Sequence, residues 1–385
     1  MTHDVDVLSR EELTSLVERV FTPRPGDTAL AILVDLPDAR TKDTDRWRAR
    51  REMAAGWARE LDAARGSTGL PTRLFLYRNV AVNNADLPAT ATEHPPDAPV
   101  PSQADQLDPA AAIPFSQVFK THSILLAPTQ LSATAPLKLA ARAHGFRAAT
   151  MPGFSAAMVP ALRLDYTEIN RRVSLLKELL DPAELAVIRF ATADADHRLD
   201  LDLRHRTAHA SGGLLPEPGT AGNLPSGETF IVPYEGERGP TRSAGTIPVQ
   251  LGEEVVVYGV EANRAVRVVA GGPVARSEAA RLAAEPAYGN LAELGLGVLA
   301  DFDIDPIGEI LLDEKLGLHI AFGRSDHFGG QVGARDFTSA DAVVHIDRVY
   351  LPATQPLVRV TSVDLHDADG RTTRLMQDGR YVIGF

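Results

Sequence analysis

The sequence predicts an α/β domain with a partly parallel sheet over residues 1–155, followed by a β-rich α+β domain over residues 156–385. Two observations support this division. In the first part, short uninterrupted apolar runs alternate with helix-periodic segments, as expected for strands that helices cover on both faces. In the second part, many short β-rich runs are separated by Gly, Pro and Asp. A length of 385 residues, at about 150 residues per domain, also favours two domains.

The elements of the first domain follow in a regular order. Ser9 stands three residues before Glu12, the spacing of a capping box, and begins a helix that we expect to end near Pro23. The later segments alternate between apolar runs and helix-periodic stretches: strands at 28–36, 72–78, 122–128 and 146–151, and helices at 45–64 and 133–144. No GxGxxG follows the first strand and no GxxxxGK occurs, so a nucleotide site is not predicted.

Residues 87–114 interrupt this order. They contain seven prolines among Ala, Asp and Thr, a composition that removes backbone donors and disfavours both helix and sheet. We therefore expect one long loop here, which would cover a cleft or contact a partner.

The second domain opens with a clear helix at 166–180, which ends before Pro182. The segments after it are short and rich in β-formers, and the sequence has no repeat of fixed period. These expected strand regions are 185–192, 197–204, 253–272, 341–350 and 373–385.

The composition excludes several classes of protein. The chain has 39 Lys+Arg against 51 Asp+Glu, a formal net charge of −12, which disfavours nucleic acid as a partner. It has no cysteine, so disulfides, thiolate metal sites and a cysteine nucleophile are absent. Any metal would therefore be held by histidine and carboxylate side chains.

The sequence also gives an expectation for location. Its first 21 residues are acidic and amphipathic and lack the basic and apolar regions of a targeting signal. No apolar stretch approaches the roughly 20 residues that a membrane span needs. We therefore expect a cytoplasmic protein without a membrane partner.

Candidate functional residues occur in four short segments of the second domain. Glu228 follows a Gly/Pro-rich turn, where it could also be a solvated turn residue. Glu293 is a single acid in an apolar, glycine-dotted run and needs a cation beside it if it is buried; the alternative is a glutamate on a helix surface. His319 lies in an apolar strand-like run and is either a ligand or a hydrogen-bonded core residue.

The fourth segment contains His345 and Asp347, two apart in an expected strand. Strand alternation places both on one face, where one ion could take an imidazole nitrogen and a carboxylate oxygen. Together, the four segments supply three carboxylates and two imidazoles, the ligand set of a dinuclear zinc, cobalt or manganese hydrolase. Such ions would activate a bridging water, polarise a substrate carbonyl and stabilise the tetrahedral oxyanion.

Other residues rank lower as ligands. Glu309 and Glu314 are close enough to His319 in sequence to be alternates for Glu293. His205 and His209 are four apart but lack the HExxH order, and the arginines around them favour a solvated segment. We expect four aspartates to lie on strand or turn surfaces: Asp194, Asp196, Asp200 and Asp202.

Four motifs together resemble the thermophilic metalloaminopeptidases of the aminopeptidase T and aminopeptidase S group. The motifs are NLPSGE (223–228), AELGLG (292–297), LLDEK followed by HIAFG (311–323), and HID (345–347). The resemblance is clear over residues 160–350. It implies two divalent metal ions, a small peptide or amide substrate and a homodimer. It also implies that the ligands, in chain order, are Glu228, Glu293, His319, His345 and Asp347.

One departure from this family concerns catalysis. The family usually has a tyrosine seven residues after the histidine of HIAFG, where this chain has Asp326, followed by His327. The resemblance implies that Asp326 or His327 takes the place of the tyrosine as proton donor. Glu228 or Glu293 would act as general base toward the bridging water.

A second lineage is a more distant match and resembles 2,5-dihydroxypyridine 5,6-dioxygenase. It implies a single Fe(II) held by His319, His345 and Asp347 as a facial triad. A mononuclear site has no need for Glu228 and Glu293, so the two glutamates favour the dinuclear hydrolase. A binding scaffold without catalysis is disfavoured because every ligand position is filled.

Overall fold

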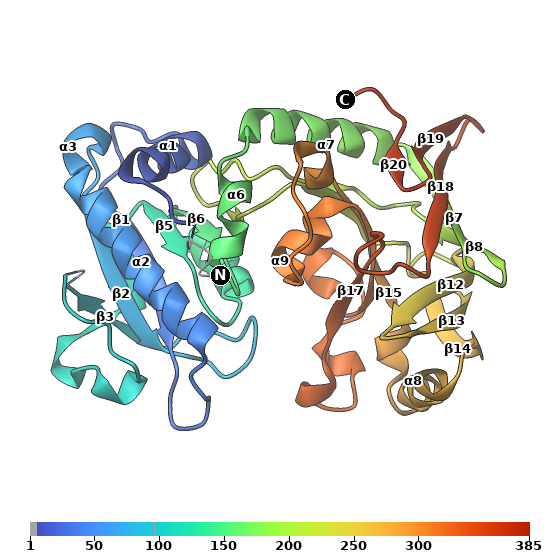
Figure 1. The fold of residues 1–385 in the computed structure, drawn as a ribbon, viewed down its shortest axis with the longest axis horizontal. Helices are drawn as coiled ribbons and strands as arrows, with labels where there is room; N and C mark the ends of the chain where they lie inside the picture. The colour runs from blue at the N-terminus through green and yellow to red at the C-terminus, as the bar shows by residue number, and fades with distance from the viewer. Residues whose placement is uncertain (1–5, 96) are drawn as a thin grey trace. The chain divides into compact units, whose positions relative to one another are not determined.

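The computed structural model describes residues 6–95 and 97–385, and the chain forms two units (Figure 1). The first unit comprises Met1–Ile169 with Gly213–Ser226, and the second comprises Asn170–Gly212 with Gly227–Phe385. Residues 1–5, which open the segment searched for a targeting signal, and Pro96 of the proline-rich segment lie outside the described residues. In the described part of the chain, no helix is both long and apolar enough to cross a bilayer.

The first unit contains a seven-stranded, partly parallel sheet, as predicted. The strand order is β10-β6-β5-β1-β2-β3-β4. Its parallel part consists of β10 (Ala221–Asn223), β6 (Arg147–Thr150), β5 (Ile124–Ala127), β1 (Leu30–Leu36) and β2 (Thr72–Arg78), and its antiparallel edge of β3 (Thr90–His94) and β4 (Ala112–Pro114).

The helices of this unit cover strands that are buried on both sides. All seven residues of β1 are buried, which explains why its sequence is an uninterrupted apolar run. Helix α2 lies across β1 and β2 (Figure 1), and Ser9 and Glu12 form the predicted capping box of α1. The described helices are α1 (Arg10–Phe21), α2 (Asp45–Ala63), α3 (Arg65–Thr68), α4 (Phe115–Thr121), α5 (Thr134–His144) and α6 (Val159–Leu162), with 3-10 turns at Ala104–Gln106, Pro109–Ala111 and Ala156–Met158.

The prediction of one structureless loop over 87–114 is wrong. β3 pairs antiparallel with β2, and β4 pairs with β3, so the segment forms the edge of the sheet. The five residues of β3 contain no proline and can form a full ladder. Pro114 ends the outermost strand, where a missing backbone donor costs least.

The segment Gly213–Ser226 returns to the first unit after the chain has entered the second. Its strand β10 adds to the sheet beside β6. The buried side chain of Arg147, on β6, joins this segment to the rest of the unit. Its Nη1 donates to the carbonyl oxygens of Phe21 (2.5 Å) and Pro216 (3.3 Å), and its Nη2 donates to Asp27 Oδ2 at 2.5 Å.

The second unit is β-rich, as predicted, and contains two antiparallel sheets. The larger has the order β14 (Arg264–Ala270), β13 (Glu254–Glu261), β12 (Ala244–Leu251), β8 (Asp196–Asp202), β7 (Ala183–Ala191), β18 (Arg359–Asp367), β19 (Thr372–Gln377) and β20 (Arg380–Tyr381). The smaller has the order β17 (His345–Val349), β16 (Leu318–Gly323), β15 (Leu291–Gly297), β11 (Glu228–Ile231) and β9 (His209–Ser211).

Short helices accompany these sheets. Helix α7 (Tyr166–Leu180) has the predicted bounds and runs from the first unit into the second along the chain. The others described are α8 (Pro273–Ala284), α9 (Ile310–Asp313) and 3-10 turns at Pro286–Gly289, Leu299–Phe302, Glu314–Leu316 (η6), Asp326–Phe328 (η7), Ala334–Asp336 and Ala340–Ala342.

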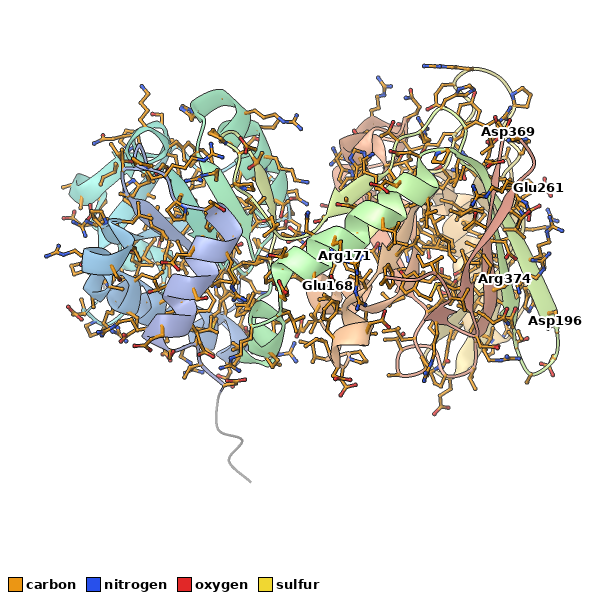
Figure 2. All side chains as sticks on the ribbon, turned by 90° about the horizontal axis from the view of Figure 1, so that it is seen from above. Glu168, Arg171, Asp196, Glu261, Asp369 and Arg374 are labelled. Carbon is orange, nitrogen blue, oxygen red and sulfur yellow. The ribbon has the colours of Figure 1, made fainter. Side chains whose placement is uncertain are left out.

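Charged side chains project from the larger sheet, among them Asp196, Glu261 and Arg374 (Figure 2). The exposure of Asp196 agrees with the prediction for the four aspartates. Asp202 does not agree, because its side chain is fully buried. It is ion-paired with Arg204 at 2.7 Å and accepts the backbone N–H of Arg242 at 2.8 Å, and these bonds offset its loss of water.

Replacing Arg147 with methionine should destabilise the first unit by about 3 kcal/mol or more, because the largely buried Asp27 would lose its ion-pair partner and keep the backbone N–H of Arg24, and the carbonyl oxygens of Phe21 and Pro216 would lose Arg147 as donor. Both tryptophans, Trp47 and Trp57, lie on α2, so urea unfolding followed by tryptophan fluorescence reports on this unit. The exposed Arg142→Met is the matched control and should leave the midpoint unchanged. Equal midpoints for both variants would show that Arg147 does not hold the returning segment.

Candidate metal centre

The register of the smaller sheet brings the candidate ligands to one face. β11, β15, β16 and β17 are neighbours, and each carries at least one of them. Glu293 lies opposite Ala321, which lies opposite Asp347, and His319 lies opposite Gly295. Residues directly opposite in an antiparallel ladder share a face, as do residues two apart in a strand. All five predicted ligands therefore converge, although up to 119 residues separate them in the sequence.

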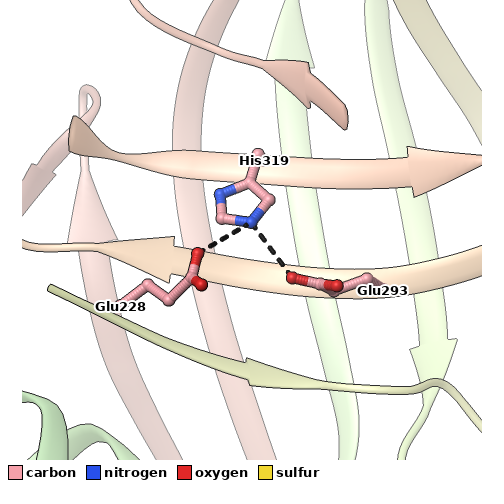
Figure 3. A group of neighbouring side chains, drawn as sticks. All are labelled: Glu228, Glu293 and His319. Atoms are coloured by element: carbon pink, nitrogen blue, oxygen red, sulfur yellow. Dashed lines mark hydrogen bonds and ion pairs between the residues drawn. The ribbon is translucent and has the colours of Figure 1, made fainter. Parts of the chain in front are cut away.

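Glu228, Glu293 and His319 form one group of potential ligands (Figure 3). Their ligand atoms lie within 4.8 Å of one another. His319 Nε2 is 3.2 Å from Glu293 Oε1 and 3.5 Å from Glu228 Oε2, so both carboxylates face the same ring nitrogen. The other ring nitrogen, Nδ1, lies 3.3 Å from the Gly317 carbonyl oxygen, a bond that leaves Nε2 for a metal ion.

A second group consists of Glu293, His345 and Asp347, also with ligand atoms within 4.8 Å. His345 Nε2 is 3.4 Å from Glu293 Oε2 and 3.5 Å from Asp347 Oδ1. The His345 Nδ1 donates to the Arg324 carbonyl oxygen at 2.8 Å. Glu293 thus belongs to both groups and presents one carboxylate oxygen to each.

Two glycines of the AELGLG motif make room for the site. A Cβ on Gly295 would lie 1.9 Å from His319 Nε2, and one on Gly297 would lie 2.2 Å from the Lys315 carbonyl carbon. Both distances are far below van der Waals contact. The glycines of this strand are therefore required by the ring and the turn that pack over it, and not by backbone conformation.

The donors fit a divalent metal ion. Glu228 Oε2 is buried and has no hydrogen-bond partner within the described chain. A buried carboxylate oxygen without a partner is costly, and a cation would satisfy it. Carboxylate oxygens and imidazole nitrogens are the hard-to-borderline donors that zinc, manganese, cobalt and iron accept.

The charges of the carboxylates and imidazoles in this site stabilise one another. Burial alone would raise the pKa of Glu293, but hydrogen bonds from His319 and His345 lower it well below its ordinary value. Burial likewise opposes the charged form of His319, but bonding to Glu293 and the charges of Glu228 and Asp347 raise its pKa to about 9. The pKa of His345 is raised well above its ordinary value, because Asp347 and Glu293 outweigh its burial. The two imidazoles therefore act as cations among the carboxylates.

Sequence reasoning missed Lys315, a fully buried lysine at the edge of the first group. Its Nζ donates to Glu228 Oε1 at 2.5 Å and forms a closer ion pair with Glu314 Oε1. Glu314, an alternate for Glu293 in the sequence, thus reaches the site through this lysine. Burial raises the pKa of Glu314 above its ordinary value, with the charge of Lys315 opposing and that of Glu228 adding to the shift. The charged pair inside the apolar LLDEKLGLH run was the signal available in the sequence.

The structure distinguishes the two proposed proton donors. The Asp326 carboxylate accepts from Arg324 Nε at 2.5 Å. The His327 ring instead faces the site, with its centroid 5.2 Å from that of His345. Burial and the nearby charge of His345 lower the pKa of His327 to about 4, so its imidazole is neutral near pH 7.

The structure decides several alternatives that the sequence left open for individual residues. Glu228 is buried and is not a solvated turn residue; Glu293 is buried in a strand and is not on a helix surface. Glu309 lies at the start of α9 and belongs to neither ligand group of the described chain. His205 and His209 are exposed, as expected, and pack against aromatic rings.

Comparison with known proteins establishes the fold. No protein-family model matches the chain, and no curated protein sequence matches it. A structure of 2,5-dihydroxypyridine dioxygenase from Pseudomonas putida KT2440 covers 98% of this chain and 99% of its own, with 15% identity and a TM-score of 0.61. Wild-type AmpT from Thermus thermophilus covers 97% of this chain and 100% of its own, with 16% identity and a TM-score of 0.53. The chain shares the mixed α/β and β-rich architecture of these proteins.

Replacing Gly295 with alanine should displace the His319 ring and weaken Co²⁺ binding at least about tenfold, since ring orientation controls ligation. Calorimetric titration of the metal-free protein measures this change. Gly384→Ala, at a glycine with open space around it, is the control and should bind as the wild type does. Unchanged Co²⁺ binding by the Gly295 variant would exclude His319 as a ligand in this position.

The metal-free protein should lose stability as the pH rises from about 6.5 to about 9. The folded-state pKa of His319 is raised, so its contribution is complete below its unfolded pKa and is lost as the pH passes through about 9. A shift of this size corresponds to roughly 3 kcal/mol. His345 and Glu314, with raised pKa values, act in the same direction.

Thermal unfolding in EDTA at pH 7 and pH 9.5 measures this loss. The His319→Gln variant should show a smaller difference between the two pH values. An equal difference in the variant and the wild type would mean that other groups cause the pH dependence.

Proposed function

We propose that this protein is a metal-dependent, aminopeptidase-like hydrolase with a dinuclear centre. The observation that carries the proposal is the position of Glu293. It belongs to two ligand groups at once, one with Glu228 and His319 and one with His345 and Asp347. A carboxylate that offers one oxygen to each of two adjacent groups is suited to bridge two ions, and a mononuclear site has no use for it.

The side chains of the site support such a reaction. Bound divalent ions would lower the pKa of a water molecule and polarise the carbonyl of a peptide or amide. Glu228 Oε2, buried and without a hydrogen-bond partner among the described residues, would either bind one ion or take up the proton of that water. The neutral His327 is placed to donate a hydrogen bond, and not a proton, on the His345 side of the site.

The substrate class in this proposal is a small peptide or amino-acid amide. The motifs that resemble the aminopeptidase T and S group support it, as does the fold shared with AmpT. The same resemblance supports a homodimer.

A mononuclear Fe(II) dioxygenase is the second candidate. The higher TM-score of the 2,5-dihydroxypyridine dioxygenase structure supports it, and His319, His345 and Asp347 are all present. Within the described chain, however, these three residues do not form a ligand group of their own; each ligand group includes Glu293. The geometry therefore favours the dinuclear hydrolase.

Elemental analysis of anaerobically purified protein, kept in buffer with excess divalent metal and corrected for the metal of the buffer, should find about two divalent ions per chain, the number that a bridged site holds. Release of p-nitroaniline from leucine p-nitroanilide should then depend on added cobalt or zinc. About one iron per chain, with oxygen uptake on 2,5-dihydroxypyridine and no amide cleavage, would instead establish the dioxygenase.

Replacing His345 with alanine should remove a ligand and lower kcat for the anilide at least about 100-fold, with loss of bound metal. His366→Ala is the matched control, since this histidine lies on β18 and bonds Thr372. It should retain wild-type activity and metal content. Full activity of the His345 variant without bound metal would disprove the proposal.

A further inference from the structure

Lys315 is a buried cation to which the proposed reaction gives no role. Its side chain has 0% exposure, and the turn η6 holds it four residues before His319. An ammonium group in an apolar interior is very costly unless carboxylates pair with it. Lys315 has two such partners, Glu228 and Glu314, on either side of its Nζ.

The two halves of the candidate metal centre differ because of this lysine. In the half formed by Glu228 and His319, Lys315 already occupies Glu228 Oε1, and only Oε2 faces His319. In the other half, the ion pairs of Glu293 and Asp347 are formed with histidines. A histidine can release its proton to a metal ion, since neutral imidazole is the ligand. Lys315, whose ammonium group lies between Glu228 and Glu314, is not a metal ligand and keeps its positive charge beside them.

This difference affects metal affinity directly. An ion bound by Glu228 would share that carboxylate with a permanent cation, and like charges repel strongly in a desolvated site. An ion bound by Glu293, His345 and Asp347 would displace an imidazole proton. In the described chain, the carboxylates of this half pair with histidines and not with a lysine. Lys315 also offsets the negative charges of Glu228 and Glu314 in the metal-free protein. The free energy gained when a metal ion binds Glu228 is therefore smaller.

We propose that Lys315 makes the Glu228–His319 half the weaker of two unequal metal sites. The inference rests on the proposed dinuclear function. The half formed by Glu293, His345 and Asp347 fills first, and the second ion binds only at higher metal concentration. Lys315 is thus a positioning residue that holds Glu228 in the absence of metal and sets the order of loading.

The test is a calorimetric titration of the full-length, EDTA-stripped protein with Co²⁺ alone. The wild type should bind two ions with dissociation constants that differ about tenfold or more, as expected for a nearby cation in a desolvated site. Lys315→Met should tighten the weaker ion about tenfold or more and bring the two constants together. Lys177→Met is the matched control, because that lysine, on α7, forms a partly exposed ion pair with Asp181 just beyond the end of the helix; the variant should leave both constants unchanged.

A second measurement covers the case in which the Lys315 variant does not fold without metal. The variant and the wild type are purified with Co²⁺ present, passed through a desalting column, and analysed for cobalt. The variant should retain about two ions per chain and the wild type about one, because the weaker ion dissociates during dilution. A variant that retains less cobalt than the wild type would overturn the inference. Lys315 would then strengthen metal binding by orienting Glu228 and would not weaken it by its charge.

The outcomes separate this inference from the proposed function. Two equal constants in the wild type would overturn the role of Lys315 and leave the dinuclear hydrolase in place. No Co²⁺ binding by the wild type would overturn the dinuclear function itself.

Discussion

The structure of the second unit depends on bringing three carboxylates and two imidazoles together on one face of a five-stranded antiparallel sheet, three of them buried and two, His345 and Asp347, partly buried. Each carboxylate would be very costly in isolation, so each must have a cation beside it. The sheet register supplies this by setting Glu293 between His319 and His345 and by placing Asp347 beside His345. Four strands must hold this register together, because a slip of one residue would turn a ligand to the opposite face.

The residues around the five candidate ligands hold these side chains in position. Gly295 leaves the space that the His319 ring fills, and the carbonyl oxygens of Gly317 and Arg324 hold the two imidazoles by their Nδ1 atoms. Lys315 places a positive charge beside the Glu228 carboxylate. Hydrogen bonds and ion pairs among these side chains therefore hold the candidate ligands in place.

The fold by itself does not determine the chemistry. The chain shares its architecture with a 2,5-dihydroxypyridine dioxygenase and with AmpT, at 15% and 16% identity. A scaffold that carries different reactions assigns function only through its side chains. In the proposed function, the feature that favours a dinuclear centre is the pair Glu228 and Glu293, whose carboxylates lie beside the two histidines and the aspartate and would be available to a second ion.

The sequence by itself determined the fold class and most elements, because burial on one or both faces leaves a periodic pattern along the chain. It also identified the five candidate ligands through short motifs and strand alternation. Only the tertiary structure decided which of them meet. It also decided that Asp326 turns to Arg324 while His327 faces His345, and that residues 90–94 form a strand in a proline-rich segment. Lys315 and Asp202 escaped prediction for a related reason: a charged residue can be buried only when its partners are brought close, and those partners are set by strand pairing across the chain.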